Sequence, residues 1–391
     1  MKILASKVFA ISIFCTCLPL HFLSQATPAP DPLGEDLTPK YVNEFLNIGV
    51  GARALGMSLA QVASVNDVTS GYWNPAGLTG MRHDMQVAAM HSEYFAGIAK
   101  YDYAAIGKSL DSVSSAALTF IRFGVDDIPN TTELIDAGGN INYDRITTFS
   151  AADYAFIFSY GRKGLPRNRS LGETGTSVIE PSGLAETFRW GINAKVIHRQ
   201  VGNFAHSWGF GLDAGAQFDY HNWHFGAMVK DITSTFNAWS VTLDDQTVAT
   251  FIETENAIPE NGLEIALPQL ALGASRSFQF KKVSLQAECN ANITTDGKRN
   301  TVVSSNPFSI DPNLGIEAGY DKVVFLRLGC GNVQRVKNFD GSQGWTFQPN
   351  FGVGLHVKNL TLDYALSDIG NVSDVLYSNV FSLRIDLTKG K

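Results

Sequence analysis

The sequence predicts an all-β chain: an antiparallel transmembrane β-barrel of about 14 strands with a short, partly helical N-terminal hatch in its lumen. Two observations predict it. Apolar residues alternate with small or polar ones over most of the chain, and the connections between the alternating segments are in turn short and long. A closed barrel lets strands cross a bilayer because every backbone group then finds its partner within the sheet.

The first 26 residues have the features of a secretory signal peptide. Lys2 and Lys7 precede an apolar run that starts at Val8, and the run ends before Ser24-Gln25-Ala26, which fits the rule of small residues at the cleavage site. Beyond residue 26, no stretch has the roughly 18 apolar residues that a transmembrane helix requires. We therefore expect an exported protein that is either soluble or an outer-membrane barrel.

Alternation with a period of two is clearest from Trp208 to Tyr220. Every second residue there is apolar, and the residues between are Gly, Asp or Gln. This period continues for longer than a typical strand of about 5 to 6 residues. Similar segments predict about fourteen strands, near 84–93, 98–109, 112–123, 148–160, 186–200, 208–220, 222–230, 267–278, 282–292, 312–320, 323–331, 345–356, 358–366 and 379–388.

A soluble β-sandwich is the alternative, since its strands alternate in the same way. The polar face of a sandwich meets bulk water and should be rich in Lys and Glu, whereas here it is mostly Gly, Ser, Asn, Gln and Thr. Small polar residues suit an enclosed lumen. Aromatic residues also gather near the strand ends, as they do in membrane barrels. They are Trp190, Trp208, Tyr220, Trp223, Trp345 and Tyr364.

The lengths of the connections predict the orientation of the barrel. Outer-membrane barrels have short periplasmic turns and longer external loops. The connection 161–185 does not fit this rule, because it is long and basic but falls on the side of the short turns. The expected long loops are 124–147, 231–266, 293–311, 332–344 and 367–378, and the expected turns are 110–111, 221, 279–281, 321–322 and 357.

Charged residues on the inward phase of the strands have mixed signs that nearly balance. A lumen lined in this way is either closed by salt bridges or forms a conduit, and both alternatives stay open. The residues are Arg189, Lys195, Asp213, Asp219, Glu288, Glu317, Arg327, Asp363, Arg384 and Asp386.

Several kinds of chemistry are not expected. A net charge of -7 gives no electrostatic basis for binding nucleic acid. We find no catalytic or cofactor motif, and His221 and His224 point to opposite faces of a strand, so no metal site is predicted. Cys289 and Cys330 are expected to be buried, small apolar residues on strands too far apart for a disulfide, because second-neighbour strands lie about 10 Å apart.

The segment before the first strand has the features of a short helix start. Asn74 can cap a helical turn that begins at Pro75, and Gly49, Gly51 and Gly56 allow close backbone packing. Such a segment cannot face lipid, so we expect it to lie in the barrel mouth or lumen; a periplasmic cap is the alternative. The expected organisation is a signal peptide (1–26), a Pro-rich segment (27–40), a hatch (41–82) and the barrel (83–388).

This segment resembles the N-terminal motif of the PorV/PorQ family, outer-membrane proteins of the FadL-like barrel superfamily that are associated with type IX secretion. The chain departs from the family pattern at Ser58-Leu59, where glycines are common, and at Asn66, in place of the first residue of an acidic pair. The matching residues, in order and spacing, are Arg53, Gly56, Met57, Asp67, Tyr72, Trp73, Asn74, Pro75, Ala76, Gly77 and Leu78.

The resemblance implies a non-enzymatic barrel without cofactors in the outer membrane, where lipid surrounds it. It implies binding of secreted cargo proteins through their type IX C-terminal domains, and transfer of the cargo to a sortase-like attachment protein at the surface. The alternative is a FadL-like transporter of hydrophobic small molecules; an outer-membrane hydrolase has no supporting residues. The loop 231–266 is expected to contact cargo or ligand through Phe236, Trp239, Val241 and Phe251.

Overall fold

The computed structural model describes most of the chain after residue 41. Contacts divide the chain into two units, Met1–Pro39 and Lys40–Lys391, and all described residues belong to the second. The predicted signal peptide and most of the basic connection 161–185 lie outside the described residues. No helix in the described ranges is long and apolar enough to span a membrane. Those ranges are 42–135, 138–164, 170–171, 177–178, 187–337, 342–367 and 378–388.

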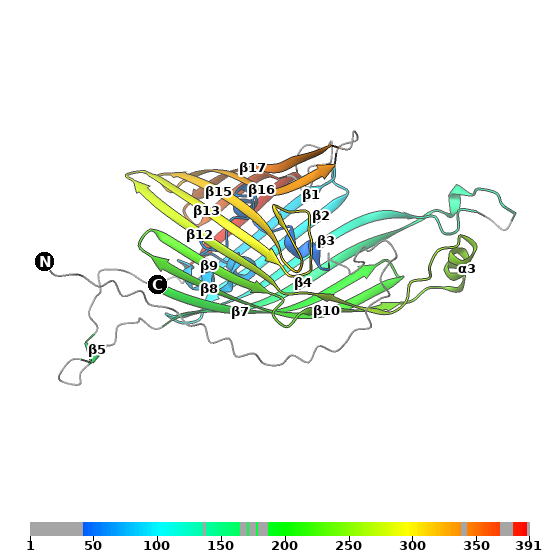
Figure 1. Cartoon of the computed structure of the whole chain (residues 1–391), viewed down its shortest axis with the longest axis horizontal. Helices are drawn as coiled ribbons and strands as arrows, with labels where there is room; N and C mark the ends of the chain where they lie inside the picture. Colours follow the sequence, from blue (N-terminus) through cyan, green and yellow to red (C-terminus); the bar gives the residue numbers. More distant parts are fainter. Residues whose placement is uncertain are drawn as a thin grey trace. The chain divides into compact units, whose positions relative to one another are not determined.

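The main sheet is a closed antiparallel barrel, which confirms the predicted fold class (Figure 1). It has 17 described strands; without the three accessory strands β10, β11 and β14, the ring has 17 − 3 = 14. Each strand pairs with the next, and β1 closes the ring by pairing with β19. The ring consists of β1 (Met85–Tyr94), β2 (Ala99–Ser109), β3 (Ser114–Asn130), β4 (Thr147–Lys163), β7 (Thr187–Val201), β8 (Ala205–Tyr220), β9 (Trp223–Lys230), β12 (Gln269–Phe280), β13 (Val283–Thr294), β15 (Ser309–Tyr320), β16 (Val324–Lys337), β17 (Gln343–Val357), β18 (Leu360–Ser367) and β19 (Ser378–Leu387).

The expectation that 231–266 is one loop is wrong. β8 pairs first with β9 and then, beyond a break, with β10 (Thr235–Val241), which in turn pairs with β11 (Gly262–Ala266). The wall of the barrel therefore continues past residue 231 as a hairpin that carries α3 (Asp245–Glu253) at its tip. Residues Asp231 to Ser234 hide this continuation in the sequence, because they interrupt the alternation.

The two ends of the barrel differ as the connection lengths predict. At one end are the short turns, such as 221–222 and 281–282. At the other end are the longer connections, including 131–146 with η3 (Tyr143–Arg145) and 295–308 with β14 (Val303–Ser304). We call these the short-turn end and the long-loop end. In the connection 161–185, the described parts are residues 161–164, where β4 ends, and a pair of two-residue strands, β5 (Ser170–Leu171) and β6 (Ser177–Val178).

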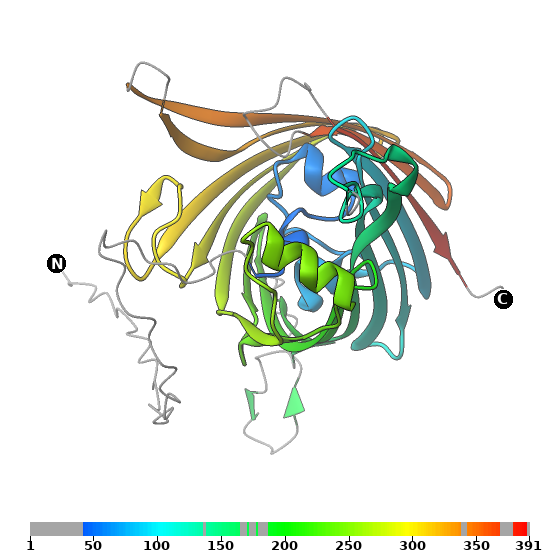
Figure 2. The same ribbon diagram turned by 90° about the vertical axis from the view of Figure 1, so that its right-hand side faces the viewer.

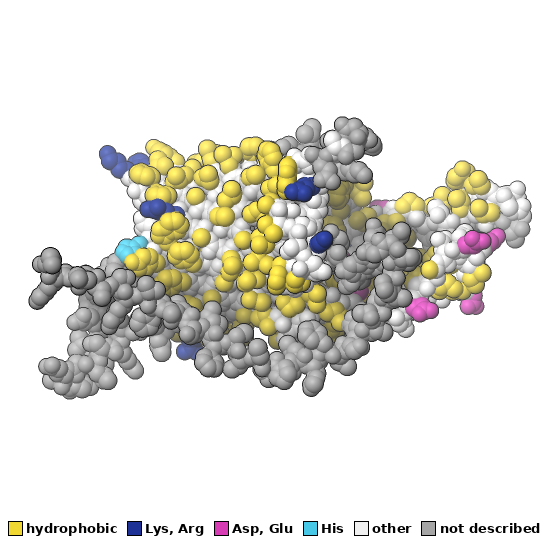
Figure 3. All heavy atoms as spheres, in the orientation of Figure 1, with side chains coloured by type: hydrophobic (Ala, Val, Ile, Leu, Met, Phe, Trp, Pro, Cys, Tyr) yellow, Lys and Arg dark blue, Asp and Glu magenta, His cyan; other side chains and the backbone are white. Residues whose placement is uncertain are grey.

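Outward side chains of the barrel are apolar, and Figure 3 shows them spread over its visible face. Cys289 lies on this face and is exposed, so the expectation that it is buried is wrong; Cys330 is half-buried. Both thiols are free, and Leu314 on β15 pairs with Cys289 on one side and with Cys330 on the other. Other exposed apolar residues of the strands include Leu118, Phe158, Ile192, Leu212, Leu272, Leu326 and Phe351.

Residues 42–82, which we call the N-terminal segment, lie inside the ring of strands. Figure 2, viewed from the end that carries α3, shows this segment in blue with strands around it. Its hydrogen bonds reach strands on all sides, for example Ala52 N to Ser382 Oγ on β19 (3.1 Å) and Ala63 N to Glu288 Oε1 on β13 (2.8 Å). It contains η1 (Glu44–Asn47), α1 (Ala52–Gly56), α2 (Ser70–Trp73) and η2 (Pro75–Gly80).

Candidate functional site

Asn74 fixes the turn at which the N-terminal segment changes direction. Its side chain accepts a hydrogen bond from Ala76 N (3.2 Å) and so caps η2, with Pro75 at the first position. Its amide Nδ2 donates to the carbonyls of Val62 (3.1 Å) within the segment and of Ala216 (3.1 Å) on β8. Asn74 is fully buried, so one side chain satisfies local backbone and joins the segment to the wall.

Inward-facing glycines on the strands make room for this turn. A Cβ on Gly215 of β8 would lie 2.1 Å from Asn74 Oδ1, and one on Gly191 of β7 would lie 2.5 Å from the Pro75 carbonyl carbon. On the other side of the ring, a Cβ on Gly329 would lie 2.3 Å from Ser58 N. Glycines in the polar phase of the alternation therefore leave the space that the N-terminal segment occupies. We call Gly191, Gly215 and Gly329 the seat glycines.

A chain of ion pairs joins α1 to the opposite wall. Arg53 Nε lies 2.9 Å from Glu317 Oε2, and the same carboxylate accepts from Arg327 Nε at 2.6 Å. Arg327 Nη1 then donates to Asp363 Oδ1 at 2.7 Å, so two arginines alternate with two carboxylates. Their charges cancel in pairs, and this attraction offsets the free-energy cost of removing the charged groups from water.

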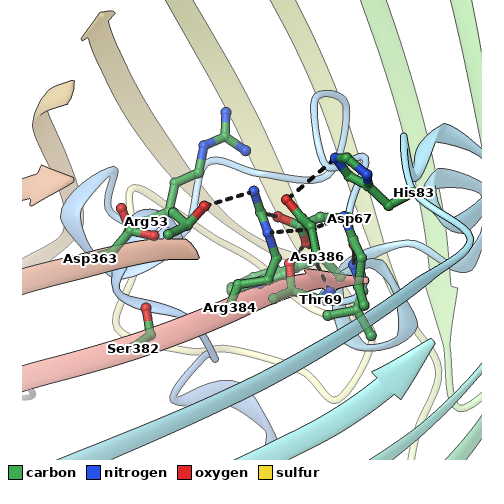
Figure 4. A network of polar contacts seen from close by, with 12 residues as sticks. Arg53, Asp67, Thr69, His83, Asp363, Ser382, Arg384 and Asp386 are labelled. Atoms are coloured by element: carbon green, nitrogen blue, oxygen red, sulfur yellow. Dashed lines mark hydrogen bonds and ion pairs between the residues drawn. The ribbon is translucent and has the colours of Figure 1, made fainter. Parts of the chain in front are cut away.

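A second set of contacts holds the middle of the segment (Figure 4). Arg384 on β19 forms an ion pair with Asp67 and lies 3.5 Å from Asp386. Asp386 accepts from Gln86 Nε2 (2.7 Å), and Gln86 in turn accepts from Val68 N (2.9 Å). Burial by itself raises the pKa of Asp67, but Arg384, the Thr69 hydrogen bonds and Arg53 outweigh it, and the pKa lies below its ordinary value.

Nine of the ten inward charges predicted from the sequence form ion pairs, and the tenth, Glu288, accepts a hydrogen bond from Ala63 N. Lys195 Nζ, for example, lies between Asp213 (2.7 Å) and Asp231 (2.6 Å), and Arg189 pairs with Asp219 (2.7 Å). Of the two alternatives for the lumen, the structure thus favours one that salt bridges close at the depth of these residues. No group of metal-ligating side chains is found among the described residues.

A cavity of about 820 Å³ lies in the barrel between the N-terminal segment and the long-loop end. The segment forms an apolar wall of this cavity, with Tyr72 and Trp73 in edge-to-face contact, their ring centroids 4.9 Å apart. Trp73 Nε1 donates to the Val50 carbonyl (3.0 Å), which fixes the indole in this wall. The other residues that the segment contributes include Phe45, Ile48, Leu55 and Leu59.

Lys230, at the end of β9, also lines the cavity. Its ammonium lies 5.3 Å from the ring centroid of Tyr72, a cation–π contact. In the part of the chain that the structure describes, Lys230 has no ion pair within 4 Å. The sequence did not indicate this residue, because one lysine at the end of an apolar strand is an ordinary interfacial residue.

The four residues expected to contact cargo or ligand do not form one patch. Phe236 is exposed on the outer face of β10, whereas Trp239 is half-buried with the guanidinium of Arg199 5.1 Å above its ring. Val241 is the last residue of β10, and Phe251 lies half-buried on α3. None of them lines the 820 Å³ cavity.

Comparisons with known proteins find similarity among solved structures. No protein-family model matches the chain, and no curated protein sequence matches it. The toluene transporter TbuX of Ralstonia pickettii aligns with 87% of this chain and 98% of its own at 12% identity, with a TM-score of 0.48. A Pseudomonas aeruginosa FadL homologue covers 86% and 98% at 13% identity and a TM-score of 0.46. The toluene transporter TodX of P. putida covers 88% and 99% at 11% identity and a TM-score of 0.48.

Proposed function

We propose that the protein is an outer-membrane barrel that takes up a small, largely hydrophobic molecule, with the N-terminal segment as its gate. The observation that carries this proposal is the cavity of about 820 Å³ between that segment and the long-loop end. Its volume lies within the range of roughly 300–1,000 Å³ that is typical of small-molecule sites. A hydrophobic solute that binds against the apolar wall of this cavity removes its apolar surface from water, which favours binding.

Passage across the barrel then requires the N-terminal segment to move. The segment is held by ion pairs such as Arg53 with Glu317 and Asp67 with Arg384, and by the bonds of Asn74. Ion pairs and hydrogen bonds have discrete partners, so the segment can exchange one set for another without unfolding the strands. The strands themselves have continuous pairing with their neighbours and form the fixed frame.

The test uses two tryptophan substitutions on β12. Gln269 lines the cavity, while Gln279 is exposed at the other end of the same strand. With the protein in lipid nanodiscs, we expect Gln269→Trp to reduce binding of a naphthalene-based fluorescent probe and Gln279→Trp to leave it unchanged. No saturable binding by the unaltered protein, or equal binding by both variants, would refute the proposal.

A second candidate function is a receptor for secreted proteins, and a different observation favours it. At the long-loop end, α3 contacts the β3–β4 connection through Thr250 Oγ1 and the Thr132 carbonyl (3.4 Å). In Figure 1, α3 and the described residues of the connection 131–146 extend beyond the rest of the barrel. Together with β10 and β11, which carry α3, we call them the projection. Its exposed apolar residues suit contact with protein. They include Ile135, Ile141, Tyr143, Ile252 and Leu263.

For this candidate, the partners are cargo proteins with type IX C-terminal domains and a sortase-like attachment protein. The resemblance of the N-terminal segment to the PorV/PorQ family supports it. The two functions use different parts of the molecule, the cavity and the projection, so substitutions can separate them.

A further inference from the structure

The wall of the cavity opposite the aromatic residues is rich in amide side chains. They come from four consecutive strands, β13, β15, β16 and β17, and from the same end of each. Polar groups in the wall would weaken the binding of a pure hydrocarbon, because each of them loses its water when the solute binds and gains no hydrogen bond in return. We call these residues the amide wall: Asn292, Asn313, Asn332, Gln334, Gln348 and Asn350.

Part of the amide wall is already ordered by bonds between its members. Gln334 Nε2 donates to Asn332 Oδ1 (2.6 Å), and Asn332 Nδ2 donates to Gln348 Oε1 (3.2 Å). Asn350 Nδ2 donates to Ser58 Oγ in the N-terminal segment. These bonds fix the side chains in one arrangement before a ligand arrives, which lowers the entropy cost of binding.

Other polar atoms of this wall are buried without a hydrogen-bond partner among the described residues. They include Asn313 Nδ2, Asn350 Oδ1 and Asp311 Oδ1. Asn313 and Asn350 are only 3% and 4% exposed. Buried polar atoms are nearly always hydrogen-bonded in folded proteins, and because these three residues border the cavity, its contents are the place to look for the partners that their atoms lack.

The mixture of donors and acceptors indicates the kind of partner. Each amide offers both an N–H donor and a carbonyl acceptor, and a hydroxyl group is the small group that can accept from one and donate to the other. Formal charges in the lining cancel, with Glu44 and Asp311 against Lys230 and Arg299. Arg299 is moreover paired with Glu44 at 3.0 Å. The lining therefore carries no net positive charge for an anionic head group, and Lys230 lies over the Tyr72 ring, not on the amide wall.

Accordingly, we infer that the cavity binds an amphiphile with a neutral, polyhydroxylated head, such as a sugar. The hydroxyls lie on the amide wall, and the apolar part lies against Tyr72, Trp73 and the apolar residues of the N-terminal segment. This inference rests on the proposed function for the cavity as a binding site, and it adds the chemical class of the ligand.

Binding measurements in lipid nanodiscs test the inference with three probes: dodecyl maltoside, maltose, and dodecanoate as a tail with an anionic head. We expect dodecyl maltoside to bind at least roughly tenfold more tightly than dodecanoate, since several hydroxyl contacts are gained. Measurable binding of maltose by itself would show that the head is sufficient and would support the inference for a free saccharide as well.

Substitutions in the amide wall complete the test. Asn313→Leu removes the unpartnered donor, and Gln348→Met removes another amide at similar size; Asn222→Leu, in an exposed short turn, is the matched control. We expect either wall variant to weaken dodecyl maltoside binding about tenfold, with dodecanoate binding unchanged. Equal affinity for the two amphiphiles, unaffected by the wall variants, would overturn the inference and leave the proposed function standing. Failure of every amphiphile to bind would overturn both.

Discussion

Gly215 on β8 and Asn74 in the N-terminal segment fit together so closely that no side chain can stand between them. A Cβ on Gly215 would lie 2.1 Å from Asn74 Oδ1 and 3.0 Å from its Cγ. Because the wall has no side chain there, Asn74 Nδ2 reaches the backbone carbonyl of Ala216 at 3.1 Å. The glycine and the asparagine thus form one contact, and we expect changes to either to loosen the segment.

Gly215→Val should displace the Asn74 turn while leaving the barrel folded. Overpacking a filled site costs about 1–3 kcal/mol, and here the strand backbone is fixed by its ladder, so the segment must yield. Limited proteolysis of the purified protein should show faster cleavage within residues 42–82. Gly262→Val is the control, since nothing lies within 4 Å of a Cβ there. Equal protection of both variants would contradict the seat that we assign to Gly215.

Asn74→Ala removes the cap of η2 and two further hydrogen bonds. Loss of a cap costs about 1 kcal/mol, and the buried carbonyls of Val62 and Ala216 also lose a donor. In planar bilayers we expect more frequent openings than in the unaltered protein, and a larger steady conductance when residues 42–80 are deleted. If the deletion left the conductance unchanged, the segment would not be what closes the lumen.

The barrel could be predicted from the sequence because alternation is a local property. One residue in two along β8 faces outward from the ring, and this is visible without knowing which strand lies beside it. The continuation of the wall as β10 and β11 was missed since the residues from Asp231 to Ser234 break the period where the chain turns inward to Lys195. Burial of Cys289 was wrongly expected because the apolar phase of these strands faces the outside of the ring, not a protein core.

The candidate site was harder to predict. Helical start signals around Asn74 are local and could be read from the sequence, but the residues that Gly191, Gly215 and Gly329 accommodate, which are Pro75, Asn74 and Ser58, lie far away along the chain. The amide wall joins residues of four strands, and each residue by itself is an ordinary lumen residue. The sequence shows which residues face inward; it does not show which of them keep an unpartnered atom.

Lowering the pH should break the ion pair between Asp67 and Arg384 only under strongly acidic conditions. Its pKa lies below the ordinary value of about 3.9, so the carboxylate stabilises the folded state above that pH and loses this contribution as the pH falls through the lowered pKa. Protection of the segment from protease should therefore be the same at pH 8 and pH 5. Asp67→Asn should reduce protection at both, whereas Asp321→Asn, in an exposed turn, should not. A loss of protection between pH 8 and pH 5 would show that another group controls the segment.

Leu212→Arg tests whether the outward face of β8 meets lipid. Leu212 lies in the middle of this strand and is 36% exposed. An arginine at the bilayer midplane of a barrel costs about 2–4 kcal/mol, which falls to roughly 0–1 kcal/mol near the interface. Tyr220→Arg, at the end of the same strand, is the matched control. Urea unfolding in lipid vesicles should separate the two variants by at least roughly 1 kcal/mol, and equal costs would place Leu212 away from the membrane core.

Substitutions in the projection test whether it binds protein. Tyr143 is 71% exposed and Ile252 is 65% exposed, and both belong to elements at the long-loop end. Exposed apolar side chains on a folded projection are expected where a partner removes them from water, and burying one such side chain contributes about 1.5–3 kcal/mol.

The double variant Tyr143→Asp and Ile252→Asp should therefore weaken capture of a purified type IX C-terminal domain more than tenfold, and leave its cargo in the periplasm. Leu110→Asp, which changes another exposed apolar residue (57%) in a short turn at the opposite end, is the control. Because neither Tyr143 nor Ile252 lines the cavity, binding of the naphthalene-based probe should be unchanged in the double variant. Undiminished capture and secretion would exclude the projection as the protein-binding surface and leave uptake through the cavity as the function that the structure supports.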